Sequence, residues 1–499
     1  MRKLSVILPT LLAACWCTAV LATEKSDLRV LYVGVNPETA QLSDMESTFQ
    51  TAPDRLLEFK KARTPSFERF LSQHFSVVDV VFADAYTEAA SDGYDVTIFG
   101  DDITPIKEAV REQNEDGSWL YEPALYLTAE FDRAAILIDT MSPRVSLPLE
   151  HKMDWLCLCL DAHAHNLEQE HPVFNVPNKV ELTFTEEETP SNYFEYHVGR
   201  DLPDSLPMWR VQTEGYKDGD GFPIGMVSHG HGFVEAGDSE VIASGVNTKL
   251  SNAVALGRHG NLFHWGFAAA PDEMTDEAKL VFVNAIHYIA RFDGDRPYTR
   301  RQQGAFTRNI ALDVSYRASK SEDSYQGYVD FLRMAKKSEE EFLRQKQETG
   351  QKLTISEQQI LAREIEIPTR EEFLEQRILG RLAPAVVERF GTDLEKYLEY
   401  YEANVEYLVP GTERLSYVVD ADAASLETSN RDPVILDVAI SLLEQDGENA
   451  LARRVLDRYT EESFDTASGW REWFEANADH LYFAEVNGHK FEVAPERLR

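Results

Sequence analysis

The stretch Leu28-Arg29-Val30-Leu31-Tyr32-Val33-Gly34 decides how this chain is expected to fold. It is a short apolar run that ends in glycine, which is typical of a strand buried on both faces of a sheet. Similar runs follow at Val77–Phe82, Tyr94–Gly100, Ala134–Ile138 and Leu156–Leu160. Helical patterns separate the runs, and one helix is expected to start at Thr64-Pro65, with threonine as the cap and proline in the first turn. The sequence therefore predicts an α/β domain whose five central strands form a largely parallel, doubly wound sheet.

Acidic and histidine residues follow the predicted strands. Asp101 and Asp102 come directly after the third strand, Asp139 after the fourth, and Asp161 and His163 after the fifth. Because the carboxyl ends of parallel strands meet at one edge of a sheet, these side chains are expected to surround one crevice. Any ligand is therefore expected at this edge, near Asp161 and His163.

The rest of the chain divides into a closing hairpin, a linker and a helical region. A glycine-containing turn at 257–261 predicts the hairpin, and an apolar helix is expected from about Thr275 to Arg291. Pro, Gly and charge then concentrate at 293–304, and beyond them apolar residues keep helical spacing. Asn487-Gly488, between two alternating runs, predicts a terminal β-hairpin. The expected fold is α/β with a doubly wound, mostly parallel, flavodoxin-like sheet (residues 27–292), a linker (293–325), and a mainly helical C-terminal domain ending in a hairpin (326–499).

The N-terminus has the pattern of an export signal. Arg2 and Lys3 precede an apolar run, and Val20-Leu21-Ala22 fits a small-residue cleavage site. Residues 1–22 are therefore expected to be a signal peptide, so that the mature chain begins at Thr23 and is periplasmic or secreted. The alternative is a lipoprotein anchored through Cys15. No later segment has the roughly 20 apolar residues of a membrane-spanning helix.

The charge balance excludes some partners. With 49 basic and 86 acidic residues among 499, the formal net charge is −37. Such a surface repels nucleic acid and anionic lipid, so neither is expected as a partner. The excess of acid fits a solvated exported protein.

Four stretches of the α/β region resemble the class I glutamine amidotransferase-like superfamily, within it the trehalose-utilisation (ThuA-like) branch. They are the opening strand Leu28–Gly34, the strand 155–160 running into Asp161 and His163, the segment Glu170–Phe174, and the closing hairpin 254–263. The resemblance covers about residues 28 to 291 and implies carbohydrate-related binding or hydrolysis.

The chain departs from a working amidotransferase. Such an enzyme needs a cysteine on a glycine-flanked strand-to-helix turn, and a His and a Glu two residues apart. Neither G-x-C-x-G nor H-x-E occurs in this sequence. Glutamine amidotransferase activity is therefore not expected, and whether the protein is an enzyme at all stays open.

Cys157 and Cys159 lie two apart within the fifth predicted strand, so both thiols are expected on one face. Small buried apolar residues are the preferred interpretation. A disulfide between them is disfavoured because alternate residues of an extended strand are about 6.6 Å apart, near the upper limit for a disulfide. A soft-metal site using both thiolates is the remaining alternative.

The histidines supply the other candidate sites. Asp161, His163 and His231 are candidate catalytic residues, and Asp101, Asp102, His229, Arg258 and His259 are candidate ligand-binding residues. His163 and His165, spaced i, i+2, are candidate ligands of a divalent metal, as in His/carboxylate hydrolytic sites. For each, plain hydrogen bonding within a loop or strand is the simpler alternative.

Three functions follow from these patterns. The first is an exported protein that binds or hydrolyses carbohydrate, or another small ligand, at the strand ends. The second is a non-catalytic interaction or scaffold module of the envelope, with a protein partner on the helical C-terminal domain. The third is a metal-dependent hydrolase that uses the His/Asp cluster.

Overall fold

The computed structural model describes residues 25–42, 52–113, 119–155, 157–231, 233, 237–301, 307–391, 393–412 and 416–495. The predicted signal peptide, its cleavage site after Ala22 and the alternative lipidation site Cys15 all lie outside the described residues. Among the residues that are described, no helix is both long enough and apolar enough to cross a bilayer.

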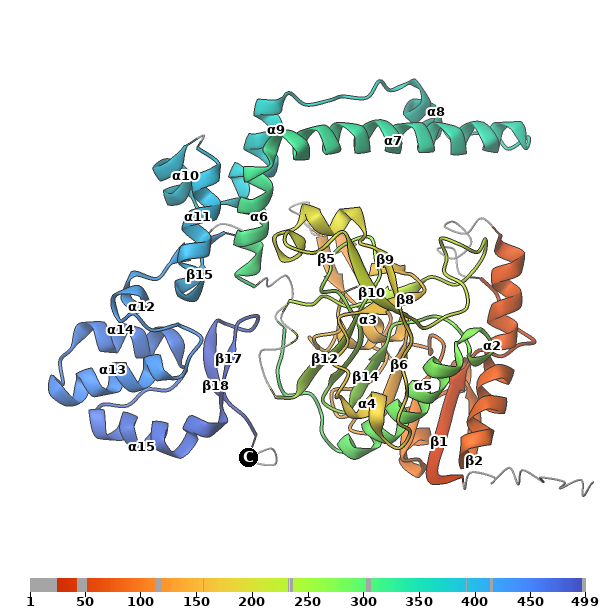
Figure 1. Cartoon of the computed structure of the whole chain (residues 1–499), viewed down its shortest axis with the longest axis horizontal. Coiled ribbons are helices and arrows are strands. Elements are labelled where there is room, and N and C mark those ends of the chain that lie inside the picture. The colour runs from red at the N-terminus through yellow and green to blue at the C-terminus, as the bar shows by residue number, and fades with distance from the viewer. Residues whose placement is uncertain are drawn as a thin grey trace, which may run out of the picture.

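A sheet of ten strands, in the order β2-β1-β3-β6-β14-β13-β12-β8-β10-β9, organises the first half of the chain (Figure 1). Its first five strands are parallel to one another and are β2 (Phe75–Phe82), β1 (Ser26–Gly34), β3 (Val96–Phe99), β6 (Ala135–Ile138) and β14 (Leu262–Trp265). Four of these are strands that the apolar runs predict. The central strands are buried on both faces, and this burial explains their continuous apolar sequence.

The other half of the sheet is antiparallel. It contains β13 (Val254–His259), β12 (Ser239–Gly245), β8 (His163–His165), β10 (Ser205–Arg210) and β9 (Phe184–Glu188). β13 and β14 form the predicted hairpin, and Gly260 at its turn has φ +57°, a conformation that favours glycine. The protein is therefore α/β with a large mixed sheet, in which seven of the ten strands run in one direction.

The fifth predicted central strand is not part of this sheet. Its described residues form β7 (Cys157–Leu160), which pairs with β11 (Gly225–Val227) in a separate two-stranded sheet. β14 takes the fifth parallel position instead. The prediction was wrong because an apolar run shows that a strand is buried but not which strands are its neighbours.

The two faces of the large sheet are covered differently. On one face, the long helix α2 (Pro53–His74) and α5 (Asp276–Ile289) pack on the side chains of Val30, Tyr32 and Ile136. On the other, Leu31, Val33 and Leu137 meet the short helix α3 (Met141–Ser146) and irregular segments. α2 begins twelve residues before the predicted start at Pro65, which lies inside the helix. Thr64 does not cap the helix, because its hydroxyl donates to Val35 O at 2.7 Å.

The second half of the chain is helical. Its helices are α6 (Asn309–Ser319), α7 (Ser321–Glu348), α8 (Ile355–Ala362), α9 (Arg370–Arg377), α10 (Pro384–Phe390), α11 (Glu395–Ala403), α12 (Ala421–Ser425), α13 (Val434–Gln445), α14 (Ala450–Tyr459) and α15 (Ala467–Asn477). The predicted terminal hairpin is present as β17 (Leu481–Ala484) and β18 (Lys490–Val493). α13 packs on α14. α7 runs as a long arm, and α8 packs against it (Figure 1).

Smaller elements complete the chain. They are the hairpins β4 (Val110–Gln113) with β5 (Trp119–Glu122) and β15 (Leu408–Pro410) with β16 (Tyr417–Val419), and the short helix α4 (Pro172–Asn175).

The segment 293–325, expected to be a linker, is ordered at both ends. Asp293 pairs with Arg133 at 3.0 Å, and Arg301 pairs with Asp154 at 3.2 Å, so residues 293–301 pack on the α/β half. From residue 307 onward the chain belongs to the helical half, where α6 is largely buried. Residues 302–306, between these two parts, lie outside the described residues.

The two halves meet along a polar seam. Asp313 of α6 accepts a hydrogen bond from the backbone N–H of His197 at 3.0 Å. Glu402 of α11 contacts His197 Nε2 at 3.0 Å and also pairs with Arg200. The halves are thus joined mainly by charged and hydrogen-bonding groups.

Candidate functional site

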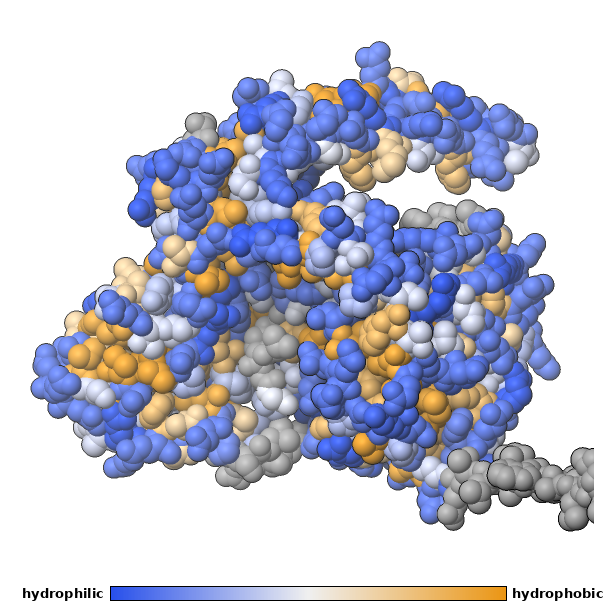
Figure 2. Space-filling view, viewed as in Figure 1, coloured by the Kyte–Doolittle hydropathy of each residue, from blue (hydrophilic) through white to orange (hydrophobic). Residues whose placement is uncertain are grey.

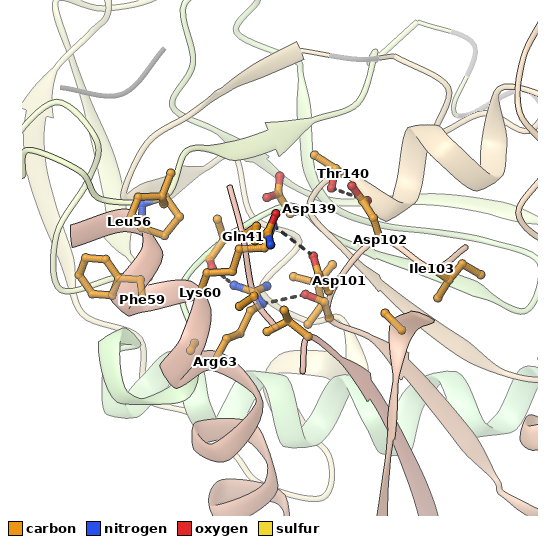
Figure 3. A pocket seen from close by; sticks show the side chains of 18 of the residues that line it. Gln41, Leu56, Phe59, Lys60, Arg63, Asp101, Asp102, Ile103, Asp139 and Thr140 are labelled. Atoms are coloured by element: carbon orange, nitrogen blue, oxygen red, sulfur yellow. Dashed lines mark hydrogen bonds and ion pairs between the residues drawn. The ribbon is translucent and has the colours of Figure 1, made fainter. Parts of the chain in front are cut away.

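A cavity of about 450 Å³ opens at the carboxyl ends of the parallel strands (Figure 3). Most of its lining comes from the segments that follow β1, β2, β3, β6 and β14 and from one face of α2, and Leu158, Pro223 and Ile224 complete it. Parallel strands bring these segments to the same edge, where open α/β sheets bind ligands. This is the edge at which the sequence predicts a ligand site, and that site stays a prediction.

The floor of the cavity depends on a close approach between β1 and β3. A Cβ atom on Gly100 would lie 2.1 Å from the hydroxyl oxygen of Tyr32, so any larger residue would displace the ring. Tyr32 itself is fully buried and stacks on Phe67 of α2. Gly100 therefore allows the end of β3 to reach the cavity.

α2 contributes two cations to the cavity wall, Lys60 and Arg63, which are one helical turn apart. Arg63 Nε donates to Gly100 O at 2.8 Å, and its Nη1 donates to Ala268 O. The guanidinium thus ties the end of β3 to the segment after β14. Lys60 Nζ lies 3.9 Å from Asp101 Oδ1.

Asp102 is held by hydrogen bonds and an ion pair. Its Oδ1 accepts a hydrogen bond from Thr140 Oγ1 at 3.0 Å and lies 2.6 Å from Arg144 Nε. Arg144 Nη1 in turn donates to the hydroxyl oxygen of Tyr126 at 2.9 Å. Asp102 is therefore fixed as the paired carboxylate of the cavity wall.

Asp101 is in a different environment from its neighbour. Burial raises the pKa of its carboxyl, and the charge of Lys60 opposes that shift only in part. A carboxyl with a raised pKa can hold a proton that an ordinary aspartate has lost, and can donate it to a ligand. Asp101 is the candidate acid of the cavity.

Asp139 stands at the turn between β6 and α3. Its φ is +54°, in the left-handed region that non-glycine residues rarely adopt. Such strain gathers at functional sites, where surrounding structure holds a side chain in a set position. Figure 3 shows Asp139 beside the same space as Asp101 and Lys60.

The lining combines charge with apolar surface. Five acidic residues line the cavity, namely Asp84, Asp101, Asp102, Asp139 and Glu273, against the three cations Lys60, Arg63 and Arg144. Leu56, Phe59 and Ile103 add apolar surface. An excess of acid disfavours anionic ligands and leaves many hydrogen-bond acceptors for a neutral polar ligand.

The two cysteines lie beside this cavity. Leu158, between them, lines its wall, and Cys157 and Cys159 form a disulfide. The sequence argument against this bond was wrong because β7 is not regularly extended. Its pairing with β11 shifts register around Cys159, and the two Cα atoms are only 5.7 Å apart.

Asp161, His163 and His165 do not line the cavity. They lie in and just before β8, which is four strands from β6 in the sheet, a separation of about 19 Å at the usual strand spacing. Asp161 faces Lys217 at 3.8 Å, and burial lowers the pKa of His163. His165 contacts Tyr193 Oη at 3.1 Å, and burial lowers its pKa to about 4. The expected crevice is therefore divided between two places on the same edge.

His229 and His231 lie near the seam between the halves rather than at the cavity. Their rings are 4.8 Å apart, and the His229 ring is 4.7 Å from that of Trp155. His231 Nδ1 contacts Asn309 Nδ2 at 3.2 Å, and its Nε2 lies 3.8 Å from Asp313. These contacts connect the α/β half to α6.

Arg258 and His259 lie at the opposite edge of the sheet, because β13 is antiparallel to β14 and ends where β14 begins. Arg258 pairs with Glu240 at 2.9 Å and lies over the ring of Phe292. His259 is fully buried, and its Nε2 contacts Thr299 Oγ1 at 3.0 Å. Through these contacts, both residues stabilise the packing at this edge of the sheet.

A divalent metal stays a prediction. Within the part of the chain that the structure describes, no group of three or more His, Cys, Asp or Glu side chains is arranged to hold a metal ion. His163 and His165 alternate along β8, where His165 is buried against Tyr193.

The sequence interpretation missed the cavity's cations. Lys60 and Arg63 come from α2, more than twenty residues after the end of β1, and Arg144 comes from α3, six residues after the end of β6. One signal could have indicated them, since Lys60 and Arg63 are one turn apart on the helix that follows the first strand.

Comparison with protein-family models, with curated proteins and with solved structures finds no match for this chain.

Proposed function

We propose that the strand-end cavity binds a small, neutral, polyhydroxylated ligand of the carbohydrate class, and that Asp101 is the acid in its hydrolysis. The observation that carries the proposal is the raised pKa of Asp101 in an acid-rich cavity of about 450 Å³. Ligand pockets are typically about 300–1,000 Å³, so one or two sugar rings fit this volume.

The chemistry of the lining supports a sugar. Carboxylates and cations hydrogen-bond to hydroxyl groups, and the ring of Phe59 offers a surface for the C–H face of a sugar. Hydrolysis of a glycosidic bond generally uses two carboxyl groups, one of which is protonated. Asp101 is the proposed proton donor, and Asp139, which lines the same cavity, is the proposed second carboxyl.

The strand order supports the expected flavodoxin-like character of the parallel half. Numbered along the chain, its five strands lie in the order second, first, third, fourth, fifth, which is that of flavodoxin-like sheets. Such sheets bind their ligand where the order reverses, between the first and third strands, and the cavity lies at the ends of β1 and β3. We retain the proposed relationship of the α/β half to the amidotransferase-like, ThuA-like proteins, but we propose no amidotransferase activity for it.

Export is the proposed localisation. The Cys157–Cys159 disulfide supports it, because disulfides persist in oxidising compartments such as the periplasm or the extracellular space.

A non-catalytic interaction role for the helical half is the second candidate. Phe331, Met334 and Phe342 are more than half exposed and fall on one side of α7. Figure 2 shows pale apolar side chains under the α7 arm, above an open gap. Exposed apolar side chains on a projecting helix are typical of protein-interaction surfaces.

Isothermal titration of the full-length protein with glucose, maltose and trehalose tests the first candidate, together with an assay for released reducing sugar. We expect binding of at least one sugar, and hydrolysis of a disaccharide that is lost in Asp101→Asn. The matched control is Asp276→Asn, which removes the same charge from a side chain that is 98% exposed on α5.

Equal binding and hydrolysis in wild type and Asp101→Asn would show that Asp101 has no role. If no sugar binds to the wild-type protein, the carbohydrate proposal is rejected and the interaction role is the remaining candidate.

A further inference from the structure

A second hollow, which we call the arginine cleft, lies between helices of the C-terminal half. Its volume is about 100 Å³. It is lined by Arg317 of α6, Ser324 and Tyr328 of α7, Phe373 and Arg377 of α9, and Arg381 of the short helix η7 (Leu379–Arg381). The cleft is separate from the strand-end cavity and shares no residue with it.

All the charged side chains that line the arginine cleft are positive. Three guanidinium groups line it and no carboxylate does, in a chain with 86 acidic and 49 basic residues. No carboxylate of the described residues lies within 4.0 Å of the guanidinium of Arg317 or Arg377. Other arginines nearby do have such partners, for example Arg333 with Asp330 at 3.4 Å.

The contacts of Arg377 include no carboxylate among the described residues. Arg377 donates to the hydroxyl of Tyr328 at 2.7 Å and lies 4.7 Å over the same ring, and both contacts are with a neutral group. Asp313, one turn before Arg317 on α6, accepts the backbone N–H of His197. Like charges that line one small cleft disfavour one another, and a bound anion would offset this effect.

We propose that the arginine cleft binds a tetrahedral oxyanion, phosphate or sulfate, free or as a monoester. Arginine presents N–H donors in a planar fork that matches two oxygens of such an anion. Ser324 and Tyr328 supply hydroxyl groups at the same cleft. A volume of about 100 Å³ accepts one such anion and is too small for a sugar ring with its substituents.

Binding would have a structural consequence for the arm. Ser324 and Tyr328 lie at the base of α7, Arg317 on α6 and Arg377 on α9. An anion held by all of them joins three helices at one point and braces the base of the arm.

The test is isothermal titration of the full-length protein with inorganic phosphate, in chloride buffer at constant ionic strength. We expect wild type to bind phosphate, and Arg317→Ala and Arg377→Ala each to bind at least about tenfold more weakly, since a charged hydrogen bond is lost. Arg333→Ala is the matched control on α7 outside the cleft, and it should bind as wild type does.

Two further measurements make the test more specific. Sulfate and glycerol phosphate distinguish a site for free anions from one for phosphate monoesters, because a monoester site prefers glycerol phosphate. Arg317→Lys keeps the charge and loses the fork, so it should bind with intermediate affinity if the cleft is the site. The proposal is overturned if none of the three anions binds, or if wild type, Arg317→Ala and Arg317→Lys bind phosphate equally.

Discussion

The α/β half and the helical half use their buried charges in different ways. In the α/β half, acids and cations gather at the strand ends around a cavity, above a sheet whose two faces are apolar. In the helical half, Arg308 is 1% exposed and lies inside the fold, where its backbone N–H and Nε donate to Glu485 Oε1 at 2.6 and 3.1 Å. The comparison teaches that removing a carboxylate of the strand-end cavity should cost ligand binding, whereas removing Glu485 should cost folding of the helical half.

The largest expected effect is that of Glu485→Ala. This change leaves Arg308 buried without its counter-charge, and it should destabilise the helical half by about 3–5 kcal/mol. Hydrogen exchange followed by mass spectrometry measures the two halves separately, and exchange should speed up in α6 and β17 while β1 and β3 stay unchanged.

The control for this variant is Glu461→Ala, whose side chain is 80% exposed and pairs with Lys490. An exposed pair of this kind contributes about 0–1 kcal/mol. Equal protection of α6 in wild type and Glu485→Ala would show that the buried pair does not hold the helical half together.

An intermediate effect is expected from the disulfide. Cys157→Ala with Cys159→Ala should lower the stability of the α/β half by about 1–2 kcal/mol, because the bond closes a very short loop and removes little chain entropy. The measurement is the melting temperature with and without reductant. Reductant should lower the melting temperature of the wild-type protein and leave the melting temperature of the double variant unchanged. If reductant does not change the melting temperature of the wild-type protein, the disulfide does not contribute to stability.

The smallest expected effect on stability is the pH dependence due to Asp101. Because burial raises the pKa of this carboxyl, its protonated form is favoured in the folded state, and the stability it contributes is present in acid. That stability is lost as the pH rises from the ordinary aspartate range through the raised pKa. Asp101→Asn mimics the protonated form, so its advantage over wild type should grow with pH across this window and then level off.

Urea unfolding of both proteins at a series of pH values measures this difference, and Asp276→Asn should follow wild type throughout. A constant difference between Asp101→Asn and wild type at every pH would mean that Asp101 has an ordinary pKa.

Local patterns predicted those parts of the fold in which neighbours in sequence are neighbours in space. The strand β1, the hairpin of β13 and β14, the helix α5 and the terminal hairpin β17–β18 all follow from periodicity and turn residues. The position of β7 outside the large sheet could not be predicted from local patterns, because its pairing with β11 depends on residues more than sixty positions later in the chain.

The candidate site was predictable only in part, for the same reason. Asp101, Asp102 and Asp139 line the cavity because each directly follows a parallel strand. Asp161 and His163 also precede or begin a strand at this edge, but the antiparallel strands β13 and β12 lie between β14 and β8 and separate them from the cavity. The arginine cleft gathers residues 317, 377 and 381 from three helices, and no local pattern connects them.

The position of β14 has a consequence for the biosynthesis of this protein. β14 pairs with β6, so that Leu262 meets Ala135, and the segment Ala268–Ala270 that follows β14 closes one wall of the cavity. A nascent or prematurely ended chain that stops before β14 contains β1, β2, β3 and β6 but has no complete cavity. The cavity is therefore completed only when synthesis has passed Ala270, about halfway along the chain, and the proposed ligand has no complete site on a shorter chain.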